Sequence, residues 1–541
     1  MNKFLSRLFG RLSLTFLAIV IQFCWMVFLV YLFSEKVEYV NIFIHIMSAV
    51  LAVIVLNRDI QPYNKVSWIL LILCLPIFGC MCYYIFGRPE LTKKNRRKLY
   101  RTHKFYEKYY DENQKELEQV KQENYYAYKQ ARYISKYGDY PIYQSDDIEY
   151  FSKVENLFPK LLEDLENAKR FIFLEFFIVD EGYMLDKIME ILTRKVKEGV
   201  EVRFIYDDVG CVNTMSRKKW ADLEKRTGVK FAMFNKFKPV MSVVMNNRDH
   251  RKIVVIDGKT CYTGGFNLAD EYINKIERFG YWKDSGVRFA GKPVKNYTLM
   301  FLEMWNYING TFEDADFYIN MYENTQSISK DSAENSIKNN INQDNIAQEN
   351  INQDNIAQKN AYIQPYGDSP LDHEYVGENV YMTMINNAKE YVYIFTPYLI
   401  IGSELTQSLI NAAKSGVDVR IVTPGIPDKK AVFLLTQSSY EPLIEAGVKM
   451  YQYTPGFIHA KCCISDDESG IVGTINFDFR SLYMHFECAV SMFKCSAIKS
   501  LKKDFIETFE KSELISIEFT KKRDYIVRFW QSILRAFAPL L

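Results

Sequence analysis

The chain has 541 residues, which is ample length for a two-lobed enzyme with a substantial core. Its formal net charge is only +2, so no overall positive field indicates a nucleic-acid partner. Its ten cysteines are scattered without zinc-site spacing, and we expect neither a metal ion nor a cofactor.

Three apolar segments near the N-terminus predict a helical membrane anchor. Residues 12–33 are long enough to cross a bilayer, and residues 68–86 are nearly so. Residues 42–56 are shorter and would need help from their flanks to span. We expect a first transmembrane segment within residues 1–35 and a transmembrane hairpin within residues 36–88.

A basic stretch follows the anchor and begins a helical juxtamembrane region over residues 89–135. Residues 88–108 contain nine Lys or Arg, against three before the first apolar segment. This bias predicts a multi-pass protein of the cell membrane with a cytoplasmic catalytic domain, although the three N-terminal charges act in the opposite direction. The stretch could bind anionic lipid head groups, or it could be an ordinary solvated helix.

The next region, residues 136–323, contains the segment "DHRKIVVIDGKTCYTGGFN" at 249–267. An apolar run within it predicts a strand that ends at an Asp-Gly turn. Side chains alternate along a strand, so His250 and Lys252 point to the same side. An imidazole and a fixed cation on one face suit an anionic substrate, above all a phosphate.

Residues 324–361 are rich in Asn, Gln, Ser and Asp and contain a near-perfect ten-residue repeat, "NINQDNIAQE" then "NINQDNIAQK". So little apolar surface cannot offset the entropy lost on ordering. We expect a disordered linker here, with no part in the chemistry.

The region after the linker, residues 362–541, repeats the first motif as "IHAKCCISDDESGIVGTIN" at 458–476. Counted from each His, a Lys stands at +2, an Asp at +7, a Gly at +14 and an Asn at +17 in both copies. The upstream segments "KEGVEVRFIY" (197–206) and "KSGVDVRIVT" (414–423) also match. Alternating strands and helices predict two related α/β halves that pack together.

Paired H-x-K-x4-D motifs, each followed by G-x-x-N, resemble the phospholipase D superfamily. Four segments are similar to its bacterial cardiolipin synthase branch: "YDDVG" (206–210), "TGGFNLADEY" (263–272), "YWKDSGV" (281–287) and "GTINFDFRSLYMHFE" (473–487). The resemblance covers most of residues 36–323 and 362–541. It implies two pseudo-repeated halves of mixed sheets flanked by helices, behind the N-terminal anchor. One departure is His485, where that branch usually has Asn.

The two motifs, if they meet around one phosphodiester, predict a two-step displacement. One imidazole attacks phosphorus to form a phosphohistidine, and the other protonates the leaving alcohol and then deprotonates the incoming one. The identical spacing leaves the two roles open, and the resemblance implies His250 as nucleophile and His459 as acid and base. The groups expected to bind the non-bridging oxygens are Lys252, Lys461, Asn267 and Asn476.

Each imidazole also needs a carboxylate on its other nitrogen to hold the correct tautomer. Each half offers one candidate, Asp284 at 34 residues after His250 and Glu487 at 28 residues after His459, and the resemblance implies this role for both. The motif aspartates complete the catalytic motif, but each follows a strand at a turn. For Asp257 and Asp466 we therefore prefer turn capping to a part in the chemistry.

The substrate class depends on context, because the same paired motif serves nucleases, lipid hydrolases and phosphatidyl transferases. A membrane anchor and a near-neutral charge favour anionic phospholipid over nucleic acid. The resemblance implies that two phosphatidylglycerol molecules condense into cardiolipin and glycerol. The alternatives are a phospholipase D that uses water or another alcohol, and a membrane scaffold without activity. The sequence does not indicate an oligomeric state.

Overall fold

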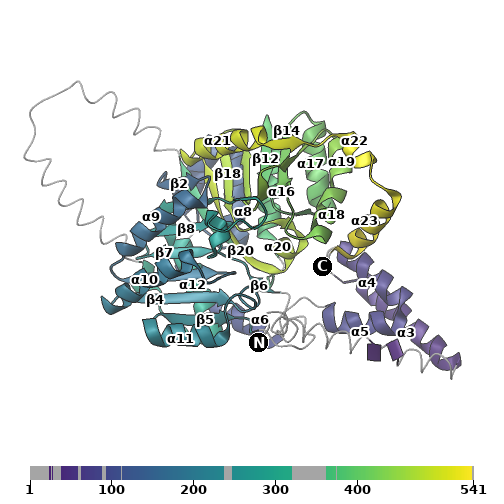
Figure 1. Cartoon of the computed structure of the whole chain (residues 1–541), viewed down its shortest axis with the longest axis horizontal. Coiled ribbons are helices and arrows are strands. Elements are labelled where there is room, and N and C mark those ends of the chain that lie inside the picture. The colour runs from purple at the N-terminus through teal and green to yellow at the C-terminus, as the bar shows by residue number, and fades with distance from the viewer. Residues whose placement is uncertain are drawn as a thin grey trace, which may run out of the picture. The chain divides into compact units, whose positions relative to one another are not determined.

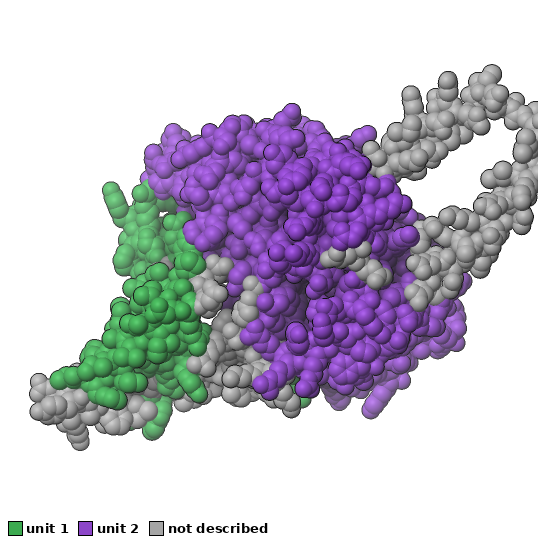
Figure 2. Space-filling model, turned by 180° about the vertical axis from the view of Figure 1, so that it is seen from behind, with its two compact units in different colours: residues 1–93, 235–247, 523–541 green, residues 94–234, 248–522 purple. Residues whose placement is uncertain are grey.

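The computed structural model describes residues 24–25, 27–28, 38–58, 62–87, 93–110, 113–236, 247–319, 361–372 and 374–538. The chain divides into two compact units (Figure 2). Unit 1 consists of residues 1–93, 235–247 and 523–541, and unit 2 of residues 94–234 and 248–522. The expected first transmembrane segment and the expected linker lie almost wholly outside the described residues.

Unit 1 contains helices from both ends of the chain: α3 (Glu38–Leu56), α4 (Pro62–Cys74), α5 (Pro76–Phe86) and α23 (Tyr525–Phe537). Within the described residues, no helix has the length and apolar character needed to cross a membrane. The sequence predicts one span over residues 68–86, but the structure ends α4 at Cys74 and begins α5 at Pro76. A proline fits the first turn of a helix but interrupts a helix interior, because it lacks the N–H group and clashes with the preceding turn.

Unit 2 begins with α6 (Lys93–Tyr106), α7 (Gln114–Glu123) and α8 (Tyr125–Tyr137) and then contains both α/β halves (Figure 1). The first half forms a mixed sheet in the order β2-β10-β8-β7-β3-β4-β5. Its strands are β2 (Ile148–Phe151), β3 (Phe171–Phe176), β4 (Glu201–Asp207), β5 (Lys230–Phe234), β7 (Ile253–Ile256), β8 (Thr260–Gly264) and β10 (Gly286–Ala290). Strands β3, β4 and β5 are parallel, and β7, β8 and β10 pair antiparallel.

The second half repeats this order as β11-β20-β18-β17-β12-β14-β15 and extends it with β1 and β21. Its core strands are β12 (Tyr391–Phe395), β14 (Asp418–Pro424), β15 (Lys449–Tyr453), β17 (Cys462–Ser465), β18 (Ser469–Gly473) and β20 (His485–Phe493). Strand β11 (Tyr362–Asp368) takes the place of β2, and the added strands are β1 (Tyr143–Gln144) and β21 (Ser512–Leu514). Parallel and antiparallel pairs fall at the same places as in the first sheet. The two mixed sheets confirm the α/β pseudo-repeat that the sequence predicts.

Helices cover both sheets. The first half carries α9 (Val154–Glu166), α10 (Tyr183–Lys197), α11 (Arg217–Thr227), α12 (Val294–Asn309) and α13 (Asp316–Ile319). The second carries α16 (Val376–Asn387), α17 (Ser403–Lys414), α18 (Lys430–Ser438), α19 (Tyr440–Glu445), α20 (Phe479–Tyr483), α21 (Ala497–Glu510) and α22 (Ile517–Lys521). Strand β3 shows the alternation: Ile172 and Leu174 join one core with α9 and α10, while Phe173 stacks on Phe301 of α12 with centroids 4.5 Å apart.

A buried polar cluster joins the two halves. The carboxylate of Asp504 on α21 accepts a hydrogen bond from Lys283 Nζ at 2.6 Å and another from Tyr150 OH at 2.6 Å. Lys283 and Tyr150 belong to the first half. A buried charge is strongly destabilising without its partner, so this cluster favours one relative placement of the halves.

Candidate active site

Two short strand pairs cross between the halves and carry the motif histidines. Strand β16 (Gly456–Ile458) pairs parallel with β9 (Tyr281–Lys283) of the first half. Strand β6 (Arg248–Asp249) pairs parallel with the start of β20 in the second half. In the first pair, the residues after Ile458 and Lys283 are His459 and Asp284, which therefore lie beside each other. In the second pair, the residues after Asp249 and Phe486 are His250 and Glu487, which lie beside each other in the same way.

The imidazoles therefore bind carboxylates of the opposite half. Nδ1 of His250 lies 2.9 Å from both Glu487 oxygens, and Nδ1 of His459 lies 2.6 Å from Asp284 Oδ2. The sequence names one candidate carboxylate in each half. The structure places each one beside the histidine of the opposite half, because β6 and β9 pair with strands of that half. An imidazole that donates from Nδ1 has its lone pair on Nε2.

Further donors hold each carboxylate in place. Glu487 accepts from Ser481 Oγ at 2.6 Å and from the Thr474 hydroxyl, and Asp284 accepts from the backbone N–H of Ser285 at 2.8 Å. Sequence reasoning missed the two hydroxyls, although both lie in the segment 473–487 that carries the family resemblance. They fix the Glu487 carboxylate, which in turn orients the imidazole of His250.

Both motif lysines are buried beside their histidines. Lys252 is fully buried and donates to the His250 carbonyl at 2.6 Å, and Lys461 donates to the His459 carbonyl in the same way. Burial lowers the pKa of Lys252 to about 8 and that of Lys461 to about 7. A bound phosphate would oppose this effect, since its negative charge stabilises the ammonium form.

The charged groups of each motif affect the pKa of the histidine in the other motif. Burial lowers the pKa of His250, and the charges of Lys252, Lys461 and His459 lower it further. Burial, followed by the Lys461 charge, lowers the pKa of His459 to about 4 against the opposing effect of Asp284. Burial raises the pKa of Asp284, but the charges of His459 and Lys461 outweigh burial and lower it overall. Both imidazoles are therefore neutral in the free protein at physiological pH.

The motif aspartates lie at the far end of their strands from the histidines. Asp257, after β7, accepts hydrogen bonds from three successive backbone N–H groups at residues 169–171, over 2.8–3.0 Å. Asp466, after β17, does the same at residues 389–391 over 2.8–3.0 Å. Both have φ of +55°, which Asp tolerates better than most residues. These contacts fit the turn-capping interpretation and give neither residue a place at the imidazoles.

The motif asparagines are not equivalent. Asn267 accepts from the Ile178 N–H at 3.0 Å and donates to the Tyr272 hydroxyl at 2.7 Å. These contacts join two loops and use the amide oxygen and one of its two N–H donors, so the substrate-binding role of Asn267 stays a prediction. Asn476 is also buried, and its Oδ1 has no hydrogen-bond partner among the described residues.

The motif glycines lie where strands approach closely. A Cβ at Gly264 would come within 2.4 Å of the Ser285 carbonyl oxygen, and one at Gly473 within 2.4 Å of the Cys488 carbonyl oxygen. Both oxygens belong to the backbone, so a side chain could not be accommodated without moving the neighbouring strand. The glycine at +14 of each motif therefore allows close contact with the backbone of the residue that follows Asp284 or Glu487.

One cluster at the site is not expected from the sequence. Ligand atoms of His250, His485 and Glu487, one from each residue, lie within 4.8 Å of one another. The ring centroids of the two histidines are 5.6 Å apart. His485 and Glu487 are two residues apart in the sequence, but only the pairing of β6 with β20 brings His250 to them.

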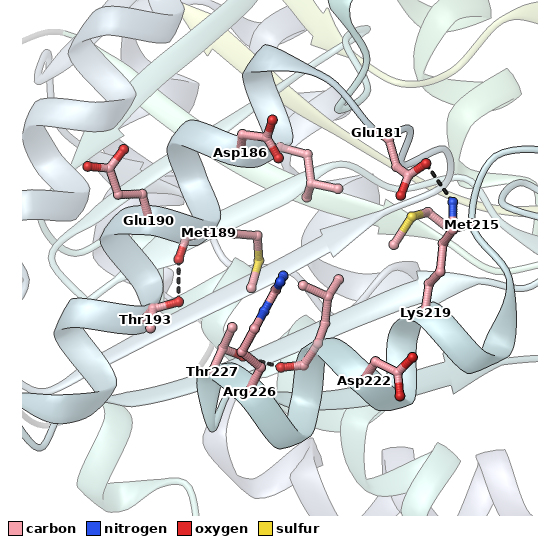
Figure 3. Close-up of a pocket in the computed structure, with 12 residues that line it drawn as sticks. Glu181, Asp186, Met189, Glu190, Thr193, Met215, Lys219, Asp222, Arg226 and Thr227 are labelled. Atoms are coloured by element: carbon pink, nitrogen blue, oxygen red, sulfur yellow. Dashed lines mark hydrogen bonds and ion pairs between the residues drawn. The ribbon is translucent and has the colours of Figure 1, made fainter.

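A separate pocket of about 570 Å³ lies between α10 and α11 (Figure 3). Its lining mixes acidic and basic side chains, among them Glu181, Asp186, Lys219 and Arg226, with methionines. No residue that lines it belongs to the paired motifs. This pocket is therefore separate from the candidate active site.

Comparisons with known proteins agree with this geometry. The family model "Cardiolipin synthase, PLD-like domain" matches residues 161–287 and 381–509, one match in each half, and "Phospholipase_D-nuclease N-terminal" matches residues 46–88. A cardiolipin synthase of Alkalihalophilus pseudofirmus is 30% identical over 91% of this chain and 92% of its own. The chain belongs to the phospholipase D superfamily, as a cardiolipin synthase-like protein.

Other relatives of this phospholipase D-like chain extend the comparison. An uncharacterized protein of Streptococcus mutans is 40% identical over 90% of this chain and 98% of that protein. The crystal structure of a phosphatidylserine synthase from Haemophilus influenzae aligns with a TM-score of 0.52 at 16% identity, over 76% of this chain and 98% of its own. That likeness shows the shared two-domain fold alone.

Proposed function

We propose that this chain is a membrane phosphatidyltransferase that condenses two phosphatidylglycerol molecules into cardiolipin and releases glycerol. The observation that supports it most is the pair of buried imidazoles, each oriented by a carboxylate of the opposite half and flanked by a buried lysine. The relatives named as cardiolipin synthases suggest the specific reaction.

In the first step, Nε2 of His250 attacks the phosphorus of one phosphatidylglycerol, and the bond to the glycerol oxygen breaks. His459 protonates that oxygen, glycerol leaves, and a phosphatidyl-histidine remains. In the second step, His459 takes the proton from a hydroxyl of a second phosphatidylglycerol, which attacks phosphorus and releases His250. The assignment of His250 as nucleophile follows the family resemblance, because Nδ1 of each imidazole contacts a buried carboxylate and this common contact does not distinguish the two roles.

His459 must acquire a proton before it can act as an acid, although its pKa is lowered to about 4 in the free protein. A bound phosphodiester brings a negative charge between the two buried lysines, and this charge raises the pKa of a nearby imidazole. Substrate binding and proton uptake are therefore coupled. One phosphodiester replaces another of similar stability, so the reaction needs no nucleotide-activated donor.

We also propose that unit 1 attaches the enzyme to the membrane. Large apolar side chains on its helices are highly exposed, including Phe43 at 63% and Val53 at 58% on α3. On α23, Tyr525 is 91% exposed, Phe529 62% and Trp530 54%, and aromatic rings of this kind favour membrane interfaces. The basic residues 88–108 favour a cytoplasmic catalytic domain. Protease digestion of unit 2 in inverted vesicles, but not in right-side-out ones, checks this orientation.

The test of the reaction uses purified full-length protein and phosphatidylglycerol alone, in vesicles. We expect cardiolipin and glycerol in equal amounts, and suppression of cardiolipin by excess glycerol. Phosphatidic acid without cardiolipin would instead identify a hydrolase. Cardiolipin that forms only with a cytidine-activated lipid would contradict the phosphohistidine route.

The same assay tests the shared site. Replacement of either histidine, His250→Ala or His459→Ala, should abolish turnover almost completely, and the double variant should lose little more. Two single variants that each keep about half of the activity would show two independent sites instead of one. A melting curve of each variant controls for misfolding.

A further inference from the structure

Beside the nucleophilic histidine lies a third imidazole that the proposed mechanism does not use. His485 and Glu487 are two residues apart on β20, so their side chains lie on the same face of the strand. His485 Nδ1 lies 3.7 Å from Glu487 Oε1, and the same carboxylate receives Nδ1 of His250 at 2.9 Å. Both imidazoles thus converge on one carboxylate.

The two ring nitrogens of His485 are buried, and among the described residues neither has a hydrogen-bond partner within 3.5 Å, so Nδ1 has only the long contact with Glu487 at 3.7 Å. The side chain is only 11% exposed. A buried polar group without a partner is unfavourable, and its presence in a native site calls for a ligand that satisfies it. A neutral imidazole carries one lone pair, and that lone pair is what a metal ion or a hydrogen-bond donor would use.

We propose that His250, His485 and Glu487 form a binding site for Zn²⁺ or a similar transition-metal ion, and that its occupation inhibits the enzyme. Two imidazole nitrogens and one carboxylate oxygen are a common zinc ligand set, with a fourth position left for water or substrate. The three ligand atoms lie within 4.8 Å of one another, a separation that modest side-chain movement can close around one ion.

Inhibition follows from the chemistry of the His250 ring. A metal ion on Nδ1 replaces the contact with Glu487, and the single proton of the neutral ring must then be on Nε2. A metal ion on Nε2 occupies the lone pair directly. In both arrangements no lone pair remains to attack phosphorus. The inhibition half of the proposal rests on the proposed function, whereas the binding half does not.

The second motif offers no equivalent cluster and supplies a matched control. Among the described residues, the rings that flank His459 on this side are those of Tyr272, Trp282 and Phe457, at centroid distances of 5.5, 5.4 and 5.8 Å. Asp284→Asn should therefore disturb the chemistry without disturbing the metal site. Mg²⁺ is a second control, since it prefers oxygen ligands over imidazole.

The experiment measures binding of Zn²⁺ to chelator-treated, full-length protein in detergent, by competition with a chromogenic chelator. We expect one site in the unmodified protein that weakens at least tenfold in His485→Asn and is retained in Asp284→Asn. His485→Gln provides a second variant if His485→Asn does not fold. Co²⁺ bound at the site should show no thiolate-to-metal charge-transfer band, which excludes the cysteines as ligands.

Turnover of phosphatidylglycerol is measured in parallel, for each protein relative to its own metal-free rate. We expect Zn²⁺ to inhibit the unmodified protein reversibly, Mg²⁺ to have no such effect, and His485→Asn to be at least tenfold less sensitive to Zn²⁺. Equal Zn²⁺ binding in the unmodified protein and both His485 variants would overturn the site. Binding that depends on His485 but leaves turnover unchanged would overturn the inhibition. His485-dependent binding in a protein without transferase activity would refute the proposed function and leave the site in place.

Discussion

At the scale of single residues, the site depends on which carboxylate each imidazole faces. His250 pairs with Glu487 across 237 residues of sequence, and His459 pairs with Asp284 across 175. Each half therefore supplies the imidazole of one pair and the carboxylate of the other. Such a site is complete only when both halves are folded and packed together, because neither half contains the carboxylate that orients its own imidazole.

This crossed pairing predicts which variants behave alike. With a lipid whose 4-nitrophenyl leaving group needs no proton, Asp284→Asn and His459→Ala should still form a covalent lipid adduct, while Glu487→Gln and His250→Ala should not. Turnover of the natural lipid should fall about 10²- to 10⁴-fold in the two carboxylate variants. Mass spectrometry of the trapped protein measures the adduct. If Asp284→Asn, like His250→Ala, failed to form the covalent adduct, the result would contradict the crossed pairing.

The buried Lys461 predicts a pH dependence. Its pKa is lowered to about 7, chiefly by burial, so above pH 7 the free enzyme loses this ammonium group. We expect kcat/KM to fall by up to tenfold per pH unit between about pH 7 and 9, because kcat/KM reports ionisation in the free enzyme. In Lys461→Arg the decline should begin about one pH unit higher, at the lowered pKa of Lys252 of about 8, since a guanidinium stays charged.

Unfolding would not account for that decline. Between the lowered pKa and the ordinary one near 10.5, the unfolded chain binds more protons at Lys461 than the folded chain does. The contribution of this lysine to stability therefore rises with pH over that range. Melting temperatures measured across the same pH range separate the two effects, and an unchanged alkaline decline in Lys461→Arg would assign the loss to another group.

At the scale of elements, the motif aspartates and glycines hold strands in place. Asp257 joins the turn after β7 to the start of β3, and Asp466 joins the turn after β17 to the start of β12. The sequence suggests this role through the turn signal after each strand. It does not reveal the partner, because the acceptor and its three donors are 75 to 88 residues apart.

Substitution of these aspartates should affect stability more than chemistry. Asp257→Ala or Asp466→Ala leaves backbone N–H groups without an acceptor, and we expect a loss of about 1–3 kcal/mol in the free energy of unfolding. The matched Asn variants tolerate the positive φ, keep one acceptor oxygen and should lose less. Denaturant titration measures the effect. A variant as stable as the unmodified protein but without activity would restore a catalytic role to the aspartate.

At the scale of the whole molecule, the two halves form one compact unit although a long polar segment separates them in the sequence. The composition of residues 324–361 predicts a flexible tether with no part in the site. The buried contacts of Asp504, Lys283 and Tyr150 join the halves without this segment.

Shortening the tether should therefore leave activity unchanged. Replacement of residues 326–358 by a Gly/Ser connector of half the length changes the closure free energy by only about 0.6 kcal/mol, because this term varies with the logarithm of loop length. Cardiolipin formation per folded, membrane-bound protein is the measurement. A folded but inactive product would show that the repeat has a function of its own.

The sequence by itself determined the two halves and the paired motifs, because repeats and strand periodicity are local patterns, and the family resemblance named a candidate carboxylate in each half. Only the tertiary structure decided that the carboxylates cross between halves, that Asn267 is used within the fold, and that His485 joins His250. Strand periodicity says which side chains share a face, but not which strand lies opposite. That choice is made by β6 and β9, which pair with strands of the other half.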